Sequence, residues 1–377
     1  MKNLTLAVLL LTTADSRMAL RGQTQESGTE DQPWSDALRG AIKLGRRGEY
    51  RQAVQGFEAL LSSPLLSANK ELRGYVLYEI ADCEIELGEY VQAETRSREA
   101  LRILSSGDQK RPGTFAMAES LLAVALRAQG NNAEAKAFAE DALVVGRKTM
   151  DQFHPRFGSL LTNLAQVFQQ TGDLRRAGGL CLQAATIFEK AGKANRIDSG
   201  SAYQNLAVIY VLEGKGRQAL ETVNRALAVW TQVLAPNHPF LVYALGTKIV
   251  AYKKLKMFQE AEDMIPQTLE LCASRFGPDH PERVILLNNT ASVYLADKKY
   301  GKAEPLLREA VELCRRKFAP GHPLLSSVLL NYSNVLRKLN RNEEASLARA
   351  QSEVVSAFPQ QLKTQASSGP KSGEGGR

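Results

Sequence analysis

Residues 276–323 read FGPDHPERVILLNNTASVYLADKKYGKAEPLLREAVELCRRKFAPGHP, and this stretch decides the fold. A His-Pro pair closes the loop at each end, and the two histidines, His280 and His322, lie 42 residues apart. Between them are two runs with apolar residues at a spacing of three to four, the pattern of amphipathic helices. A helical hairpin of this size cannot bury both of its faces alone, so we expect similar hairpins beside it.

Copies of the hairpin run through the chain, with the residue at the turn between the two helices as the marker. From the second marker onward, the markers follow at steps of 42 residues, and the first precedes the second by 40. An alanine stands five residues after every marker, and a small residue stands seven residues before nearly every one. Small residues at fixed points on paired helices let the helices approach closely. The markers are Gly48, Gly88, Gly130, Gly172, Gly214, Lys256, Lys298 and Asn340.

This pattern resembles the tetratricopeptide repeat. The 42-residue period and the loops LAPNHP, FGPDHP and FAPGHP resemble the kinesin-light-chain variety of that repeat, over residues 34–355. The resemblance implies an all-α fold, a right-handed superhelical solenoid of about eight helix-turn-helix repeats with a concave groove. The predicted repeats are 34–67, 73–105, 114–147, 155–191, 197–233, 239–275, 281–317 and 323–358, within an array over 34–358.

The two ends of the chain differ from the array. Residues 1–14, MKNLTLAVLLLTTA, predict a secretory signal, because Lys2 precedes a short apolar run and small residues follow it. The run is too short for a membrane span, which needs about 20 apolar residues. We therefore expect a secreted or extracytoplasmic protein, with a cytoplasmic one as the alternative. Residues 15–33 are predicted to be a flexible linker, and Pro359 is predicted to end the last helix before a disordered tail over 359–377.

The composition excludes few classes of protein. The net charge of +8 is spread along the chain and favours acidic partners only weakly. Aromatic residues make up 7% and form no basic-aromatic stripe, so nucleic acid is not expected as a partner. The four cysteines include no CxxC pair, and we interpret them as buried small hydrophobic residues.

The four histidines are the first candidates for chemistry, and their positions argue against it. Each stands before a proline at a repeat boundary, where an imidazole could cap the following helix. Repeat geometry spaces them too widely to share a metal ion. The motifs HExxH, GxSxG, GxxxxGK[ST] and GxGxxG are absent. We predict a protein that is not an enzyme and that has no metal and no cofactor.

The resemblance implies that one face of the first helix in each repeat lines the groove. It also implies that an asparagine nine residues before the marker contacts the backbone of a bound peptide. An amide supplies two donors and an acceptor for that purpose. The alternative is a framework role, in which the amide bonds the neighbouring helix. Repeats one to three carry Arg39, Glu79 and Leu121 at this position, which puts a clamp there in doubt. The candidates are Asn163, Asn205, Asn289 and Asn331.

Other polar residues lie on the same predicted face. Gln166 and Gln170 are neutral, whereas basic residues gather in repeats six and eight. Such cations attract an acidic segment, unless they are simply solvated charge. An acidic run in repeat two, Asp82, Glu84 and Glu86, is interpreted as a solvated face. The remaining binding candidates are Lys253, Lys254, Asn334, Arg337 and Lys338.

The sequence thus favours a non-catalytic scaffold or adaptor that binds a protein or peptide in its concave groove. The specific expectation is an extended acidic segment held against repeats four to eight. Two alternatives stay open: a structural spacer in an envelope assembly, and a regulatory subunit of a separate enzyme. The partner and the oligomeric state stay open as well.

Overall fold

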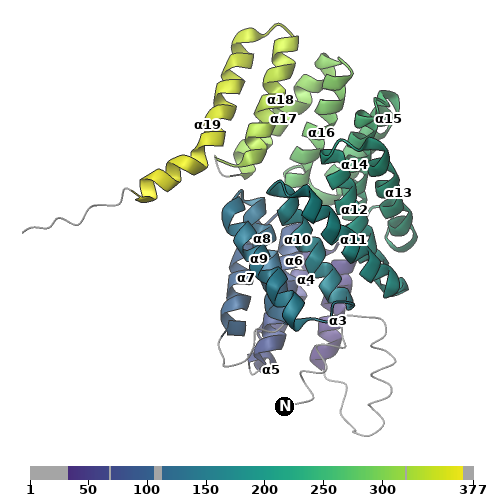
Figure 1. The fold of residues 1–377 in the computed structure, drawn as a ribbon, viewed down its shortest axis with the longest axis vertical. Helices are drawn as coiled ribbons and strands as arrows, with labels where there is room; N and C mark the ends of the chain where they lie inside the picture. Colours follow the sequence, from purple (N-terminus) through teal and green to yellow (C-terminus); the bar gives the residue numbers. More distant parts are fainter. Residues whose placement is uncertain (1–32, 68, 106–112, 319–320, 368–377) are drawn as a thin grey trace, which may run out of the picture. The chain divides into compact units, whose positions relative to one another are not determined.

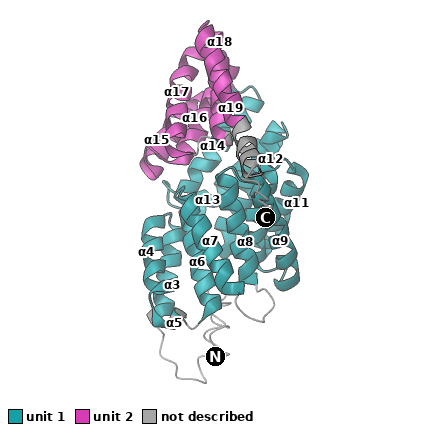
Figure 2. Ribbon diagram, turned by 90° about the vertical axis from the view of Figure 1, so that its left-hand side faces the viewer, with its two compact units in different colours: residues 1–257 teal, residues 258–377 magenta. Residues whose placement is uncertain are grey.

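The computed structural model describes residues 33–67, 69–105, 113–318 and 321–367. The predicted signal over 1–14, nearly all of the predicted linker, and residues 368–377 of the predicted tail lie outside the described residues. Two compact units follow each other along the chain, unit 1 up to Met257 and unit 2 from Phe258 (Figure 2).

Unit 1 is built of antiparallel helix pairs in chain order (Figure 1). The pairs are α3 (Pro33–Arg46) with α4 (Tyr50–Leu61), α6 (Lys70–Glu86) with α7 (Tyr90–Ser105), α8 (Gly113–Ala128) with α9 (Asn132–Thr149), α10 (Pro155–Gln170) with α11 (Leu174–Lys190), and α12 (Arg196–Leu212) with α13 (Gly216–Val233). The short helices α5 (Pro64–Ser67) and η1 (Lys193–Asn195) join pairs, and α14 (Pro239–Lys254) ends the unit.

Unit 2 begins with α15 (Phe258–Phe276), which packs on α16 (Pro281–Ala296). The pairs α16 with α17 (Tyr300–Lys317) and α18 (Pro323–Lys338) with α19 (Asn342–Ser367) complete it. Every regular element in the described part of the chain is a helix. The predicted all-α solenoid of helix-turn-helix repeats is confirmed.

The marker residues adopt the left-handed backbone conformation that turns one helix into the next. The glycine markers have φ between 74° and 88°, a region that glycine enters without steric cost. Lys256, Lys298 and Asn340 reach φ of 61°, 62° and 61°. A lysine is strained there, so the turns at Lys256 and Lys298 hold their conformation against local preference, whereas asparagine tolerates this region.

The alanine that follows each marker lies where the paired helices touch. The first seven, from Ala53 to Ala303, are fully buried, and Ala345 in the last pair is 4% exposed. Because a methyl group leaves the helix axes close together, longer side chains of the same pairs fill the core between repeats. The largest of these are Trp230, Phe57, Phe157, Phe168 and Phe188.

The four histidines cap the helices that they precede, which confirms the prediction. Each has an extended backbone, with φ between −67° and −76°, as the following proline requires. In each, Nδ1 accepts a hydrogen bond at 3.1 to 3.2 Å from the main-chain N–H two residues later. In the stretch that decides the fold, Phe276 also stacks on His280 and Phe318 on His322, both with ring centroids 4.2 Å apart.

The last helix differs from its prediction. Pro359 does not end it, since α19 continues to Ser367. The helix formers that follow, in QQLKTQA, sustain the helical backbone past the proline. Among the described helices, none combines the length and the apolar character that a membrane span requires.

Candidate functional site

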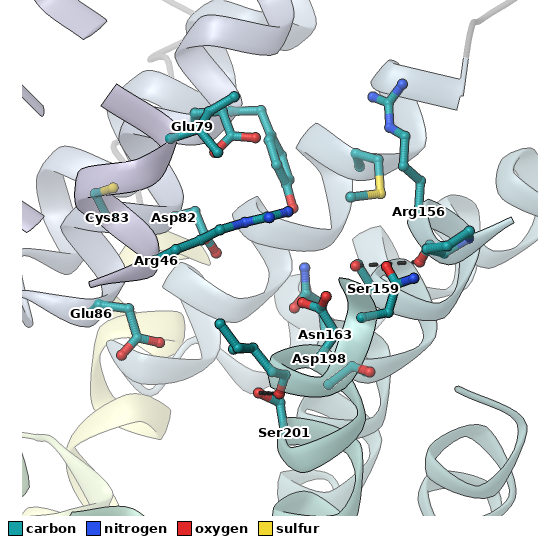
Figure 3. A pocket seen from close by; sticks show the side chains of 18 of the residues that line it. Arg46, Glu79, Asp82, Cys83, Glu86, Arg156, Ser159, Asn163, Asp198 and Ser201 are labelled. Atoms are coloured by element: carbon teal, nitrogen blue, oxygen red, sulfur yellow. Dashed lines mark hydrogen bonds between the residues drawn. The ribbon is translucent and has the colours of Figure 1, made fainter. Parts of the chain in front are cut away.

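A cavity of about 260 Å³ lies on the inner side of unit 1 (Figure 3). The first helix of most repeats contributes to its wall: α3, α6, α10, α12 and α14 supply most of the lining side chains. Aromatic rings from second helices, among them Phe57 of α4 and Phe188 of α11, close the cavity from behind. The inner face of the stacked repeats is therefore hollow at this place, and its walls come from residues far apart in sequence.

The first repeat of unit 1 meets its last helix beside the cavity. Nε2 of His238, before α14, lies 3.3 Å from the main-chain oxygen of Arg46, which ends α3. The Tyr243 hydroxyl of α14 donates to Oε2 of Glu86 in α6 at 3.1 Å. A Cβ at Gly48 would come within 2.7 Å of Pro239, so glycine at this turn also permits the close approach. The five repeats of unit 1 thus curve until their ends touch.

Acidic side chains dominate the polar wall. Glu79, Asp82 and Glu86 project from α6, and Asp198 projects from α12 (Figure 3). Two guanidinium groups, those of Arg46 and Arg156, line the same cavity. The intervals of three and seven residues from Glu79 to Asp82 and Glu86 place these three carboxyl groups on one face of α6.

Burial raises the pKa of all four carboxyl groups. The pKa of Asp82 lies well above its usual range because the side chain is desolvated and because Glu79, Glu86 and Asp198 repel its charge. Burial raises the pKa of Glu86 to about 7, against the hydrogen bond from Tyr243 that lowers it. Burial also raises the pKa of Glu79, although a hydrogen bond from Tyr75 and the charge of Arg46 oppose this shift. Burial raises the pKa of Asp198 as well, and the charge of Arg46 opposes that shift.

The interpretation of Asp82, Glu84 and Glu86 as a solvated face is wrong. Asp82 and Glu86 are half-buried and face the cavity. Glu84 is buried on the other side of α6, where Oε1 lies 3.5 Å from Nε of Arg96, and burial raises its pKa to about 7. A carboxylate stripe that faces a groove has the same helical spacing as one that faces solvent, so the sequence alone did not separate the two.

Two of the four candidate asparagines form a side-chain hydrogen bond to the neighbouring repeat. Nδ2 of Asn163 donates to Oγ of Ser120 at 3.1 Å, and Nδ2 of Asn331 donates to Oδ1 of Asn288 at 2.9 Å. Gln204 and Thr247 repeat the arrangement at 2.6 Å, again 43 residues apart. Each bond joins the first helices of successive repeats. It also leaves the asparagine one N–H and its oxygen for a ligand.

The other candidates are spread over both units. Among the predicted site residues, Asn163 and Gln166 line the cavity. Asn205 and Asn289 are half-buried, and no side-chain hydrogen bond is formed by either amide within the described residues. Gln170 and Lys254 are exposed, and burial, followed by the charge of Lys254, lowers the pKa of the half-buried Lys253. In unit 2 the exposed Arg337 donates through Nη2 to Oδ1 of Asn334 at 3.1 Å, beside the exposed Lys338.

Sequence reasoning missed the residues that make the cavity wall. The repeat pattern does not mark Arg46, Tyr75 or Arg156 as site residues, although all three line the cavity. The Cζ atom of Arg156 lies 5.3 Å from the centroid of the Tyr75 ring. The i, i+4, i+7, i+11 spacing of Tyr75, Glu79, Asp82 and Glu86 is the one signal that could have marked the face.

Models of the tetratricopeptide repeat match residues 120–156, 156–232, 242–316 and 284–351, which together make up more than half of the chain. The chain belongs to the tetratricopeptide-repeat family. Part of this repeat protein is similar to a clustered mitochondria protein homolog of Candida albicans, with 22% identity over 143 residues. The match takes in 38% of this chain and only 10% of that protein.

Solved structures similar to this repeat protein include two Rap proteins. One is the Rap conjugation gene regulator of plasmid pLS20 in complex with the Phr* peptide, at 15% identity and a TM-score of 0.58 over 78% of this chain and 80% of that one. The other is a Rap protein complexed with Competence and Sporulation Factor, at 16% identity and 0.54 over 90% and 81%. A putative kinesin light chain of Podospora anserina is similar at 22% identity and 0.44 over 55% and 98%. The likeness to the two Rap proteins shows a shared fold.

Proposed function

We propose that this tetratricopeptide-repeat protein is a non-catalytic scaffold that binds a protein or peptide on the inner face of its repeats. The observation that carries the proposal is the cavity of unit 1, which is built by successive first helices. Amide and hydroxyl groups on its wall, those of Asn163, Gln166, Ser159 and Ser201, suit hydrogen bonds to a peptide backbone.

The size of the cavity favours part of a peptide over a whole small molecule. Sites for small ligands usually enclose about 300–1,000 Å³. The cavity of about 260 Å³ lies just below that range, so it would hold one or two side chains of a chain that continues along the inner face.

The solved relatives support the same class of ligand. The pLS20 Rap regulator was solved with a peptide, and it shares the fold of this chain over most of its length. Transfer of peptide binding from that protein to this one is part of the proposal.

The residues that support binding of an acidic segment lie in unit 2. Asn334, Arg337 and Lys338 are exposed on α18, and Arg337 and Lys338 are the basic residues of its last turn. These cations would attract an acidic peptide. The four carboxyl groups of unit 1 argue against an acidic ligand in the cavity, so we confine the acidic segment to the α18 surface.

One observation favours the alternative of a structural spacer. Leu347 and Val354 of α19 are 61% and 62% exposed and stand seven residues apart, on one face of the helix. Such a face suits contact with another protein at the end of the array. Leu347→Ser with Val354→Ser would abolish assembly in this alternative and leave peptide binding unchanged in the main proposal.

Selection from a random dodecapeptide library displayed on phage, with the full chain as bait, tests the proposal. Selected peptides should lose about tenfold or more in affinity for a Gln166→Ala, Ser201→Ala double variant, because each lost hydrogen bond costs about 1 kcal/mol. Gln183→Ala is the matched control, since Gln183 is exposed on α11, away from the cavity lining. Equal loss in the control, or no loss in the double variant, would refute binding in the cavity.

A further inference from the structure

Asp82 differs from Glu79 and Glu86 of the cavity wall in forming no side-chain hydrogen bond within the described residues. Its side chain is half-buried, and its carboxyl group faces the cavity (Figure 3). Glu86 accepts the Tyr243 hydroxyl and Glu79 is bonded to Tyr75. Within the described residues, Asp82 forms no hydrogen bond and no ion pair through its side chain. A carboxylate on a cavity wall whose oxygens are not used by neighbouring side chains is free to accept hydrogen bonds from a ligand.

The two arginines of the cavity do not supply that donor. Arg156 is held elsewhere, with its guanidinium over the Tyr75 ring and Nη2 at 3.4 Å from Oγ1 of Thr114. Among the described residues, neither Arg46 nor Arg156 forms an ion pair with any of the four carboxyl groups. The cavity thus contains four carboxyl groups and two guanidinium groups, which leaves an excess of negative charge whenever the acids ionise.

We propose that the unit 1 cavity binds a basic side chain, the guanidinium of an arginine or the ammonium of a lysine, carried by the peptide ligand. Asp82 is the primary acceptor, and Glu79, Glu86 and Asp198 supply the surrounding negative field. A charge-assisted hydrogen bond to a carboxylate satisfies both groups at once. This inference rests on the proposed function, because it names the side chain that the inner face selects.

The wall of the cavity fits the rest of such a side chain. The rings of Tyr75 and Tyr78 lie 6.2 Å apart with planes only 21° from parallel, and Phe240 and Phe57 add apolar surface. The methylene stem of lysine or arginine packs on apolar walls while its head reaches a polar group. A cavity that combines an acidic end with aromatic walls discriminates a long basic side chain from a short or acidic one.

The arrangement of the acids favours an organic cation over a metal ion. No group of three or more His, Cys, Asp or Glu side chains in the described residues is placed so that it could hold a metal. The carboxyl groups therefore surround the cavity as separate acceptors and not as a chelating set. A side chain with several N–H donors can reach more than one of them.

Protonation supports the same conclusion. Burial and mutual repulsion keep the pKa of Asp82 well above its usual range. The raised pKa values favour protonated acids on the cavity wall, and a bound cation would replace a proton, which leaves to solvent. Binding of the cation should therefore strengthen as the pH rises. The other titratable and charged groups that line the cavity are Glu79, Glu86, Asp198, Arg46, Arg156, Tyr75, Tyr78 and His238.

The test uses peptides selected on the full chain from the random dodecapeptide library, each remade with citrulline in place of arginine or norleucine in place of lysine. The neutral analogues should bind about 10- to 100-fold more weakly, as expected for loss of a charge-assisted hydrogen bond. Asp82→Asn should remove this difference. Glu221→Gln, the same loss of one charge on an exposed position of α13, should retain it.

Each other outcome has a definite meaning. Selected peptides that bind the cavity without preference for a basic residue would overturn this inference and leave the proposed function standing. If agmatine binds in a way that depends on Asp82 and no peptide does, the ligand is a free cation. That result would overturn the proposal that a peptide carries the basic group. Calcium ions that compete with the peptide at an equal concentration would overturn the choice of an organic cation. Asp82→Asn folds without an unpaired buried charge, so a loss of binding cannot be ascribed to unfolding, and circular dichroism checks this.

Discussion

Nε2 of His238 lies 3.3 Å from the main-chain oxygen of Arg46, a residue 192 positions earlier in the chain. Since Nδ1 of the same ring accepts the N–H of Phe240, the neutral imidazole carries its proton on Nε2 and donates it to Arg46. One histidine thus caps α14 and joins it to the end of α3. The contact closes the inner face of unit 1 around the acidic cavity.

We expect His238→Ala to loosen this closure. The cap should cost about 1 kcal/mol, and loss of the Arg46 contact should add to it. Hydrogen exchange at the end of α3 should accelerate severalfold. His154→Ala is the control, because His154 caps α10 in the same way at 3.1 Å but forms no hydrogen bond with α3 in the described part of the chain. If the two variants change hydrogen exchange in α3 equally, the contact between His238 and Arg46 does not stabilise the end of α3.

The turn markers allow a test of backbone strain. Lys298 has φ of 62°, so Lys298→Gly should stabilise the chain by about 1 kcal/mol, the left-handed penalty less the entropy that glycine adds. Gly214 has φ of 76°, and a Cβ added there would meet no atom within 4 Å. Gly214→Ala should therefore lose about 1 kcal/mol for the opposite reason, through the backbone conformation alone.

Gly179→Ala separates this effect from side-chain volume. Gly179 is inside α11 and also has nothing within 4 Å of an added Cβ, so alanine should stabilise it by up to about 1 kcal/mol. Urea denaturation of the three variants measures the differences. A Gly214→Ala protein as stable as Gly179→Ala would contradict the strain at the turn.

The sequence predicted the helices and their turns because both depend on local spacing. Ala53 and its equivalents, the His-Pro caps and the 42-residue period each act within one repeat or between neighbours. The meeting of His238 with Arg46 does not. It depends on the small rotation between repeats summed over five of them, and no local pattern encodes that sum.

The site was harder to predict than the fold for the same reason. Asp82 lines a cavity whose wall takes residues from both α3 and α14, so the cavity depends on how the successive repeats stack. Asn163 and Asn331 were expected to touch a peptide or to bond a neighbouring helix, and the second arrangement is the one observed. Contact of these amides with a ligand stays part of the proposal.

The acidic cavity makes stability depend on pH. The folded-state pKa of Asp82 and Glu86 is raised above the value of about 4 that the unfolded chain has. Their contribution to stability is therefore fully present below pH 4 and is lost as the pH rises towards about 7, the pKa of Glu86. Asp82→Asn with Glu86→Gln should flatten the stability profile between about pH 4.5 and 7.

Urea denaturation across that range measures the effect, with Glu221→Gln as the control. The exposed Glu221 should leave the slope unchanged. A double variant with the same pH dependence as the parent chain would show that these carboxyl groups titrate normally in the folded protein.

The α18 surface should bind acidic peptides through charge. Arg337→Glu with Lys338→Glu should weaken binding of a glutamate-rich dodecapeptide about tenfold or more at low salt, and much less at about 0.5 M salt, where surface charges are screened within a few ångströms. Fluorescence anisotropy measures both. Arg349→Glu on α19, an exposed arginine paired with Glu353, serves as the control. An effect that does not change with salt would count against a charge-based contact.

The central claim is that the ligand binds to the inner face of unit 1, and one measurement tests it most directly. Hydrogen exchange with mass spectrometry would be recorded on the full chain with and without a library-selected peptide that contains arginine. We predict protection of α6 and α12, whose carboxyl groups line the cavity, and no change in α13, which contributes no residue to its wall. Protection confined to α13 or to α15–α19, with α6 and α12 unchanged, would contradict the account.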